Sequence, residues 1–230
     1  MFISFSSCGI TMSNYILPIY IHMNKYIAEF IGTFFLVLVV GLTGNPVAIG
    51  LTLALMVYTF ASTSGSNFNP AVSFGLWINQ KLSNYDFPRY LLSQLLGAGV
   101  AVLFIRLVMK KSMEVLLPAD TTVLMGIALE ALFTFLFVTV IYNVAVKKSS
   151  LPNQYFGFAI GLTIFVAATA VGKLTGGAFN PAVGLMPVLL NTETISANTN
   201  SLIVYFVGPM LGALLAAFLY RYMKEDSKKR

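Results

Sequence analysis

The chain has 230 residues, of which 57% are hydrophobic and 10% are charged, and its mean hydropathy is +0.82. Soluble domains are roughly 25% charged, so this composition indicates a membrane protein. One cysteine, Cys8, and one histidine, His22, exclude an intramolecular disulfide and leave little basis for a histidine-based enzyme or metal centre. The net charge of +6 does not indicate nucleic acid here, because the basic residues stand between and after apolar runs, where they set membrane orientation.

The first 22 residues are apolar and carry little charge, and they are interrupted by Gly9 and Pro18. A secretory signal peptide needs a basic start, and no Lys or Arg precedes Lys25. We therefore treat residues 1–22 as an uncertain N-terminal extension with no assigned function, and Met23 as an alternative start.

Six long apolar runs follow, and each is near or above the ~17–25 residues that a membrane-spanning helix needs. The predicted spans are Tyr26–Leu42, Pro46–Thr63, Pro88–Met109, Thr122–Val146, Tyr155–Val171 and Ser201–Met223. Small residues recur at four-residue spacing, as in Gly157 with Gly161 and Gly208 with Gly212. This spacing is typical of close helix packing in lipid.

Two shorter segments, Ala71–Ile78 and Ala182–Leu190, cover only about half of a ~30 Å hydrocarbon core. Each follows the same tripeptide, written in full as Asn69-Pro70-Ala71 and Asn180-Pro181-Ala182. Asn caps the free N–H groups of a helix start, and Pro at the first helical position loses no hydrogen bond. We therefore predict two half-helices whose positive ends point at a shared place near the membrane midplane.

The two halves of the chain repeat one another. The segment that starts at Ala28-Glu29-Phe30 is echoed at Leu129-Glu130-Ala131, and Ile49-Gly50-Leu51-Thr52 is echoed by Ile160-Gly161-Leu162-Thr163. With three spans per half, the second half enters from the opposite side, as an inverted repeat. We predict a channel domain over residues 23–223, with repeats at about 25–110 and 122–223, and a basic cytoplasmic tail at 224–230.

The distribution of Lys and Arg predicts that both termini are cytoplasmic. If the N-terminus is inside, ten basic residues fall on inner segments, from Lys25 and Lys81 to Arg230, and only Arg106, Lys110, Lys111 and Lys173 fall on outer ones. We expect an integral protein of the plasma (inner) membrane.

Two carboxylates, Glu29 and Glu130, lie inside predicted spans at equivalent places of the repeat. A buried acid in a membrane indicates a functional group such as a proton relay. Alternatively, each acid accepts hydrogen bonds from the irregular backbone of its own re-entrant loop. The duplication favours this structural role.

Together, the paired Asn-Pro-Ala motifs, the Ala28-Glu29-Phe30-Ile31-Gly32-Thr33-Phe34 opening and Val207-Gly208-Pro209 resemble the major intrinsic protein family, the aquaporins and glycerol facilitators. The resemblance covers Lys25 to about Met223. It implies an all-α membrane protein with six transmembrane helices and two re-entrant half-helices in an inverted repeat, assembled as a homotetramer in the lipid bilayer. It also implies a narrow pore in each subunit, where Asn69 and Asn180 contact water or a small alcohol, and no enzymatic activity, cofactor or metal.

The same resemblance places the outer constriction, the selectivity filter, at Ile49, Ala168, Gly177 and Val183. Water-selective members carry an aromatic residue, a His and an Arg there, whereas all four residues are apolar or small in this chain. Val183 stands in place of the Arg, and Asn67 stands where many members have His before the first motif.

Two consequences for permeation follow from this unusual filter. A wider, less polar constriction would admit glycerol, urea or ammonia besides water, whereas a mouth narrowed by other groups would pass mainly water. Gly184 and Tyr205-Phe206 do not match the glycerol facilitators. We expect passive flux of water and small neutral solutes. The other classes are an ion- or proton-coupled secondary transporter and a closed structural membrane protein of the same fold.

Overall fold

The computed structural model describes residues 13–147, 150–191, 195 and 198–229, and every regular element in these ranges is a helix. In chain order the elements are α1 (Ser13–Thr43), α2 (Pro46–Ser64), α3 (Pro70–Ile78), α4 (Asp86–Leu107), α5 (Val123–Ile141), the π-helix η1 (Tyr142–Val146), α6 (Phe156–Thr175), α7 (Pro181–Leu189) and α8 (Thr199–Lys229). By length and composition, α1, α2, α4, α5 with η1, α6 and α8 can each cross a membrane. The predicted fold class is therefore confirmed.

Local capping signals explain why the helix boundaries lie close to the predicted ones. Asn45 caps α2, since its Oδ1 accepts from the backbone N–H groups of Val47 and Ala48 at 2.9 and 3.2 Å. At the other end of α2, Gly65 adopts a left-handed conformation with φ of 81°, and Gly176 ends α6 in the same way with φ of 86°.

The boundaries differ from the prediction in several places, and α6 ends at Thr175 rather than Val171. Helix α1 begins at Ser13 rather than Tyr26, so the apolar residues before Lys25 continue this helix towards the N-terminus. Residues 1–12, with Cys8, lie outside the described part. The fourth span ends in the π-helix η1. Helix α8 continues to Lys229, so most of the segment predicted as a tail extends the last helix.

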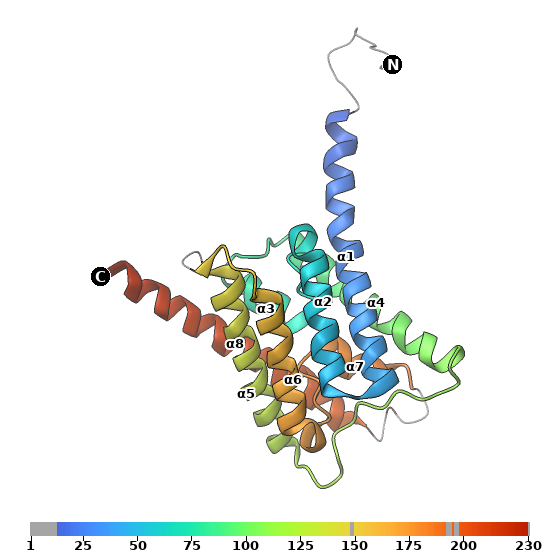
Figure 1. Cartoon of the computed structure of the whole chain (residues 1–230). Coiled ribbons are helices and arrows are strands. Elements are labelled where there is room, and N and C mark those ends of the chain that lie inside the picture. The colour runs from blue at the N-terminus through green and yellow to red at the C-terminus, as the bar shows by residue number, and fades with distance from the viewer. Residues whose placement is uncertain (1–12, 148–149, 192–194, 196–197, 230) are drawn as a thin grey trace.

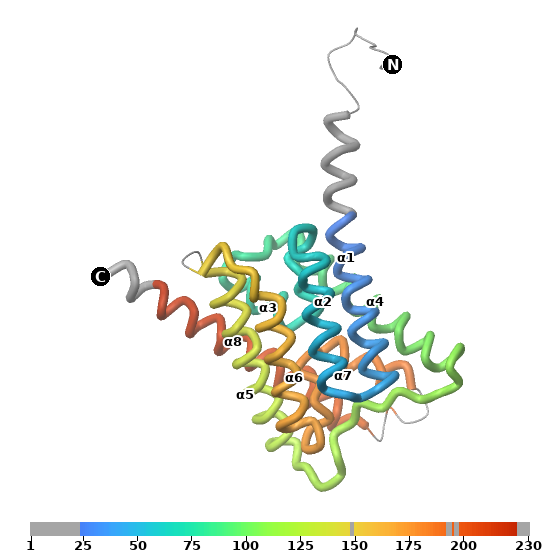
Figure 2. The backbone as a smooth tube through the Cα atoms, in the orientation of Figure 1, coloured from blue at the N-terminus to red at the C-terminus, as the bar shows by residue number. Residues whose placement is uncertain are grey.

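The packing of the long helices follows the internal repeat. In the first half α1 packs along α4, and in the second half α5 packs along α8. Helix α2 packs against α6 and joins the halves, and the two helices run side by side in the traces (Figures 1 and 2). The half-helices cross over between the repeats, because α3 contacts α8 and α7 contacts α4. Each repeat therefore contributes a half-helix to the other repeat's packing.

Glycines permit the closest helix contacts. A Cβ on Gly161 of α6 would lie 2.3 Å from the carbonyl oxygen of Gly50 on α2, and a Cβ on Gly212 would lie 2.3 Å from that of Ala131. Such a separation is far below van der Waals contact, so the backbones touch where these residues face each other. The prediction that Gly161 and Gly212 serve packing is confirmed.

We expect Gly161→Ala to reduce the free energy of unfolding by about 1–3 kcal/mol, because the added methyl group forces α6 away from α2. Gly172→Ala in the same helix is the matched control, since a Cβ on Gly172 meets nothing within 4 Å. Alanine is also the better helix former, so this control should be neutral or slightly stabilising. Thermal unfolding of the purified protein in detergent compares the two. Equal losses for both variants would contradict the packing role.

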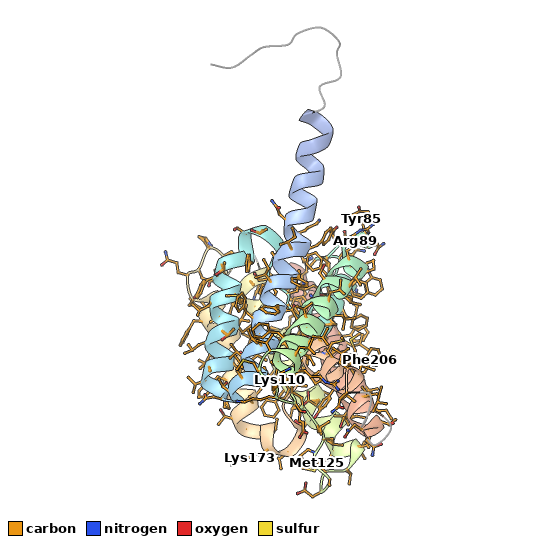
Figure 3. All side chains as sticks on the ribbon, turned by 90° about the vertical axis from the view of Figure 1, so that its right-hand side faces the viewer. Tyr85, Arg89, Lys110, Met125, Lys173 and Phe206 are labelled. Carbon is orange, nitrogen blue, oxygen red and sulfur yellow. The ribbon has the colours of Figure 1, made fainter. Side chains whose placement is uncertain are left out.

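The outer surface and its ends have the character of a membrane protein. Large apolar side chains such as Leu55, Leu92 and Leu132 are more than half exposed, as a lipid-facing surface requires. Figure 3 places Tyr85 and Arg89 at one end of the bundle, and Lys110 and Lys173 toward the other. The residues assigned to inner and outer segments are thus separated along the long axis of the molecule.

Candidate functional site: the meeting point of the two half-helices

The two half-helices start with equivalent caps. Asn69 and Asn180 have extended backbones, with φ of −155° and −153°, and each is followed by proline at the first helical position. The side-chain oxygen of Asn69 accepts from the N–H of Ala71 at 2.8 Å, and that of Asn180 accepts from Ala182 at 2.9 Å. The caps thus form as the motifs predict, and both Asn side chains are held in fixed orientations.

Each Asn also links its loop to the other repeat. The Asn69 side chain donates from Nδ2 to the carbonyl oxygen of Phe179 at 2.9 Å, and Asn180 donates to that of Phe68 at 2.9 Å. Phe68 and Phe179 both have positive φ, 50° and 47°, which is unfavourable for a non-glycine residue. This crossed pair of hydrogen bonds fixes the two helix starts beside each other, and sequence reasoning did not anticipate it.

Glu29 holds the loop before α3. It is fully buried, and its Oε1 accepts from the backbone N–H of Asn67 at 2.9 Å while its Oε2 accepts from that of Phe68 at 2.7 Å. The Ser64 hydroxyl and the Gln94 amide complete the set at 2.7 and 2.8 Å. Both carboxylate oxygens are therefore engaged by the loop and its neighbours.

Glu130 does the same for the loop before α7. Its Oε1 accepts from the N–H of Ala178 at 3.1 Å and from the Thr175 hydroxyl at 2.8 Å, and its Oε2 accepts from the N–H of Phe179 at 2.6 Å. Backbone that leaves a helix inside a membrane must find such partners. Of the two roles that the sequence left open for the acids, these contacts support the structural one.

Two tyrosines, also at equivalent places, close the start of each loop. The Tyr90 hydroxyl donates to the carbonyl of Ser64 at 2.7 Å, and the Tyr205 hydroxyl donates to that of Thr175 at 2.6 Å. These carbonyls belong to the last residues of α2 and α6. The repeat in the sequence contains both tyrosines, but nothing local in the sequence shows which carbonyl each one meets.

A narrow cavity of about 30 Å³ lies where the half-helices meet. It brings together all four predicted constriction residues, Ile49, Ala168, Gly177 and Val183, with Asn69 and Asn180. Its remaining lining residues are Leu36, Val40, Leu53, Asn67, Phe68, Phe137, Ile164 and Ala178. A volume of about 30 Å³ accommodates water-sized molecules. None of the described residues that line this cavity is ionisable.

A second, wider cavity of about 320 Å³ lies on the other side of the first loop, and we call it the inner vestibule. Its lining comprises Ser64, Gly65, Asn67, Leu76, Lys81, Leu82, Ile141, Ala145 and Val146. Asn67 lines both cavities, so the narrow cavity and the inner vestibule lie on the two sides of one residue. Among the described residues that line the two cavities, Lys81 alone is ionisable, and the sequence did not indicate that it lies at this site.

The described residues that line the two cavities include neither a set of metal ligands nor a nucleophile paired with a general base. Over the described ranges, no three His, Cys, Asp or Glu residues come close enough to hold a metal ion. The chemistry available at the meeting point is hydrogen bonding by the two Asn amides and the electrostatic field of two helix N-termini, each equivalent to roughly half a positive charge.

Comparison with known proteins identifies the family. The sequence model described as "Major intrinsic protein" matches residues 17–220. The chain is 35% identical over 224 residues to "Glycerol uptake facilitator protein-like 6" of Lactiplantibacillus plantarum, covering 89% of this chain and 100% of that protein. It is 32% identical to "Aquaporin AqpM" of Methanothermobacter thermautotrophicus, covering 88% and 98%.

A solved structure shares the fold. The X-ray structure of the aquaglyceroporin from Plasmodium falciparum superposes with a TM-score of 0.71 at 22% sequence identity, covering 86% of this chain and 95% of that one. The family model and the two relatives each cover nearly the whole chain, and the paired half-helices agree with the shared fold. The chain therefore belongs to the major intrinsic protein family.

Proposed function

We propose that the protein is a passive channel for water and small neutral solutes, which pass the meeting point of α3 and α7 in single file. The observation that carries this proposal is that both Asn side chains line one narrow cavity. An Asn Nδ2 has two N–H groups, and each of these donates one to a Phe carbonyl. The second N–H of each Asn is left to donate to a permeating molecule, while the two helix N-termini oppose a cation.

The relatives support the same function. Members of the family are channels rather than enzymes, and the similar proteins are described as a glycerol uptake facilitator-like protein and as aquaporins. Similarity to both kinds of protein favours water and small uncharged solutes as permeants for this chain.

We assign the selectivity filter to Ile49, Ala168, Gly177 and Val183. All four are apolar or small and line the narrow cavity, and Val183 is almost fully buried there. A filter without a charged side chain has neither an Arg donor for the permeant nor an Arg charge against cations. We therefore infer that it discriminates chiefly by width and admits neutral solutes such as glycerol, urea or ammonia.

Two other functions remain as outcomes of the same assay. A coupled transporter needs an acid or hydroxyl cluster for its driving ion, but both intramembrane acids are engaged by the re-entrant loops. Its flux would depend on a Na⁺ or H⁺ gradient. A closed structural protein would pass no neutral solute at all.

The assembly and its orientation are part of the proposal. We propose a homotetramer in the plasma membrane with both termini in the cytoplasm. The distribution of the basic residues supports the orientation, because ten of them fall on the segments assigned to the cytoplasm and four on the outer segments. Arg89 of the first set lies at one end of the bundle, and Lys110 and Lys173 of the second set lie toward the other (Figure 3).

Stopped-flow light scattering of proteoliposomes tests the function. An impermeant osmolyte should cause protein-dependent fast shrinkage, and a glycerol gradient should cause fast shrinkage followed by protein-dependent re-swelling. Shrinkage without re-swelling would restrict the channel to water. Shrinkage no faster than that of empty vesicles would reject the proposal.

We expect Ala168→Trp to lower the water flux at least about tenfold, because the indole exceeds the free space of the narrow cavity. The matched control is Leu92→Trp in α4, where the side chain is 59% exposed on the outer surface. Circular dichroism and thermal unfolding establish that both variants are folded. Unchanged flux in folded Ala168→Trp would show that molecules do not pass this cavity.

A further inference from the structure

A cavity of about 280 Å³, distinct from the pore cavities, opens at the end of the bundle assigned to the cytoplasm. It lies between the end of α5 with η1, the second half of α8 and the turn after α3. We call it the basic cavity, and its lining comprises Lys81, Thr139, Tyr142, Asn143, Val146, Lys147, Ala216, Leu219, Tyr220, Met223 and Lys224.

Three lysines converge on the basic cavity from three separate elements. Lys81 follows α3, Lys147 follows η1 and Lys224 belongs to α8. Among the residues that the structure describes, no Asp or Glu lines the cavity, and neither Lys81 nor Lys147 forms an ion pair. The lining therefore carries three lysines, and among the described residues the ammonium groups of Lys81 and Lys147 have no carboxylate beside them.

The backbone of Lys81 is held firmly in place. Its N–H donates to the carbonyl of Leu76 at 2.8 Å, and the N–H of Gln80 donates to that of Trp77 at 2.9 Å. With Gln80 at a φ of 56°, these two bonds form a Schellman motif that ends α3. Lys81 thus enters the cavity from a structured helix end rather than from a loose loop.

The tyrosine wall is equally well fixed. Tyr142 and Tyr220 are stacked, with ring centroids 4.3 Å apart. The Tyr142 hydroxyl donates to the carbonyl of Gly75 at 2.5 Å and accepts from the Asn79 side chain at 2.8 Å. Since Gly75 and Asn79 belong to α3 and its cap, one wall of the basic cavity is bonded to a pore half-helix.

Unsatisfied and unusual features cluster here. Three lining residues, Tyr142, Asn143 and Val146, come from the π-helix η1, and π-helical turns occur frequently at functional sites. The Thr139 hydroxyl oxygen is buried and has no hydrogen-bond partner among the described residues. A ligand that accepts hydrogen bonds would satisfy the ammonium groups of Lys81 and Lys147.

We propose that the basic cavity binds a phosphate group, presented by an anionic lipid of the adjoining leaflet or by a soluble phosphate compound. A phosphate matches a cluster of ammonium groups, because each of its oxygens accepts charge-assisted hydrogen bonds. The apolar part of the lining, from Ala216, Leu219 and Met223, suits an acyl chain, which favours the lipid. Basic pockets between membrane helices are typical sites for anionic headgroups.

Such a ligand would sit beside the pore entrance. Lys81 and Val146 line both the basic cavity and the inner vestibule. A phosphate that holds the Lys81 ammonium in the basic cavity would reduce the positive charge exposed to the inner vestibule. Binding at the basic cavity would therefore change the electrostatic potential at the inner vestibule. The binding itself does not depend on which solute the pore conducts.

Native mass spectrometry of the full-length protein tests the binding. We expect phosphatidylglycerol to be retained and phosphatidylcholine to be lost as the activating energy is raised. The double variant Lys81→Gln, Lys147→Gln should bind phosphatidylglycerol about 25-fold more weakly, at about fivefold for each lysine near an anionic headgroup. The matched control, Lys110→Gln with Lys111→Gln, removes the same charge elsewhere and should stay within about twofold.

A second measurement separates the two sources of phosphate. Thermal unfolding in neutral detergent is followed with inorganic phosphate or with chloride at equal ionic strength. Stabilisation by phosphate that requires Lys81 and Lys147, without retention of phosphatidylglycerol, assigns the site to a soluble compound. Equal loss of binding in the two double variants, or no lysine-dependent binding of either probe, overturns the proposal.

Discussion

Glu130→Leu should abolish flux and lower the free energy of unfolding by about 3–9 kcal/mol, since three buried donors lose their acceptor at about 1–3 kcal/mol each. Those donors are the N–H groups of Ala178 and Phe179 and the Thr175 hydroxyl. Leucine is close in volume but accepts no hydrogen bond, so the loop before α7 has nothing to replace the carboxylate. Thermal unfolding and stopped-flow measurements on the same preparation record both effects.

The amide variant distinguishes structure from proton transfer. Glu130→Gln keeps one acceptor oxygen for the loop, so we expect an intermediate loss of stability and a measurable residual flux. The same order should hold for Glu29, whose carboxylate has four donors. The control is Glu114→Leu, at an exposed acid outside the helices, which should change neither the flux nor the free energy of unfolding. If Gln and Leu were equally damaging to flux in stably folded protein, the acids would be proton carriers instead.

Val183→Arg should reduce glycerol flux about tenfold, an increase of about 1.4 kcal/mol in the barrier, and water flux much less. Val183 lines the narrow cavity opposite a set of small or apolar residues, so the longer side chain narrows the passage for the larger solute first. The guanidinium also adds a full positive charge to a cavity lining that has no ionisable side chain. Water needs only a narrow path and gains five new hydrogen-bond donors along it.

A second variant at Val183 distinguishes the effect of the charge and length of arginine from that of a small increase in side-chain volume. Val183→Leu adds one carbon and no charge, and we expect both fluxes to stay near those of the original protein. The informative quantity is the ratio of glycerol to water flux, measured by stopped-flow scattering on matched vesicles. A Val183→Arg protein that loses both fluxes in equal proportion would point to a damaged pore and would remove Val183 from the filter.

Much of the fold could be predicted because its signals are local. The start of α3 is set by three adjacent residues, Asn69, Pro70 and Ala71, and the end of α2 by one glycine, Gly65. Span lengths follow from the thickness of the hydrocarbon core, which any helix must match. The repeat then fixed the order of the elements, and equivalent acids were correctly located on α1 and α5.

The contacts between the repeats could not be predicted in the same way. That Asn69 donates to Phe179, or that Tyr142 bonds to Gly75, depends on how separate helices pack, and no local pattern encodes it. Lys81 was assigned only an orienting role, because a lysine in a short turn gives no sign that two cavities meet at its side chain. The π-helix at Tyr142 was likewise invisible in a continuous apolar run.

The crossed Asn bonds have a consequence for how the protein is made. The carbonyl of Phe68 is synthesised 112 residues before the side chain of Asn180 that will donate to it. At about 5–20 residues per second on the ribosome, roughly 6–22 s pass between the synthesis of Phe68 and that of Asn180. During that interval neither repeat can complete its half of the passage. The narrow cavity is therefore completed only after the second repeat is made, because residues of both repeats line it.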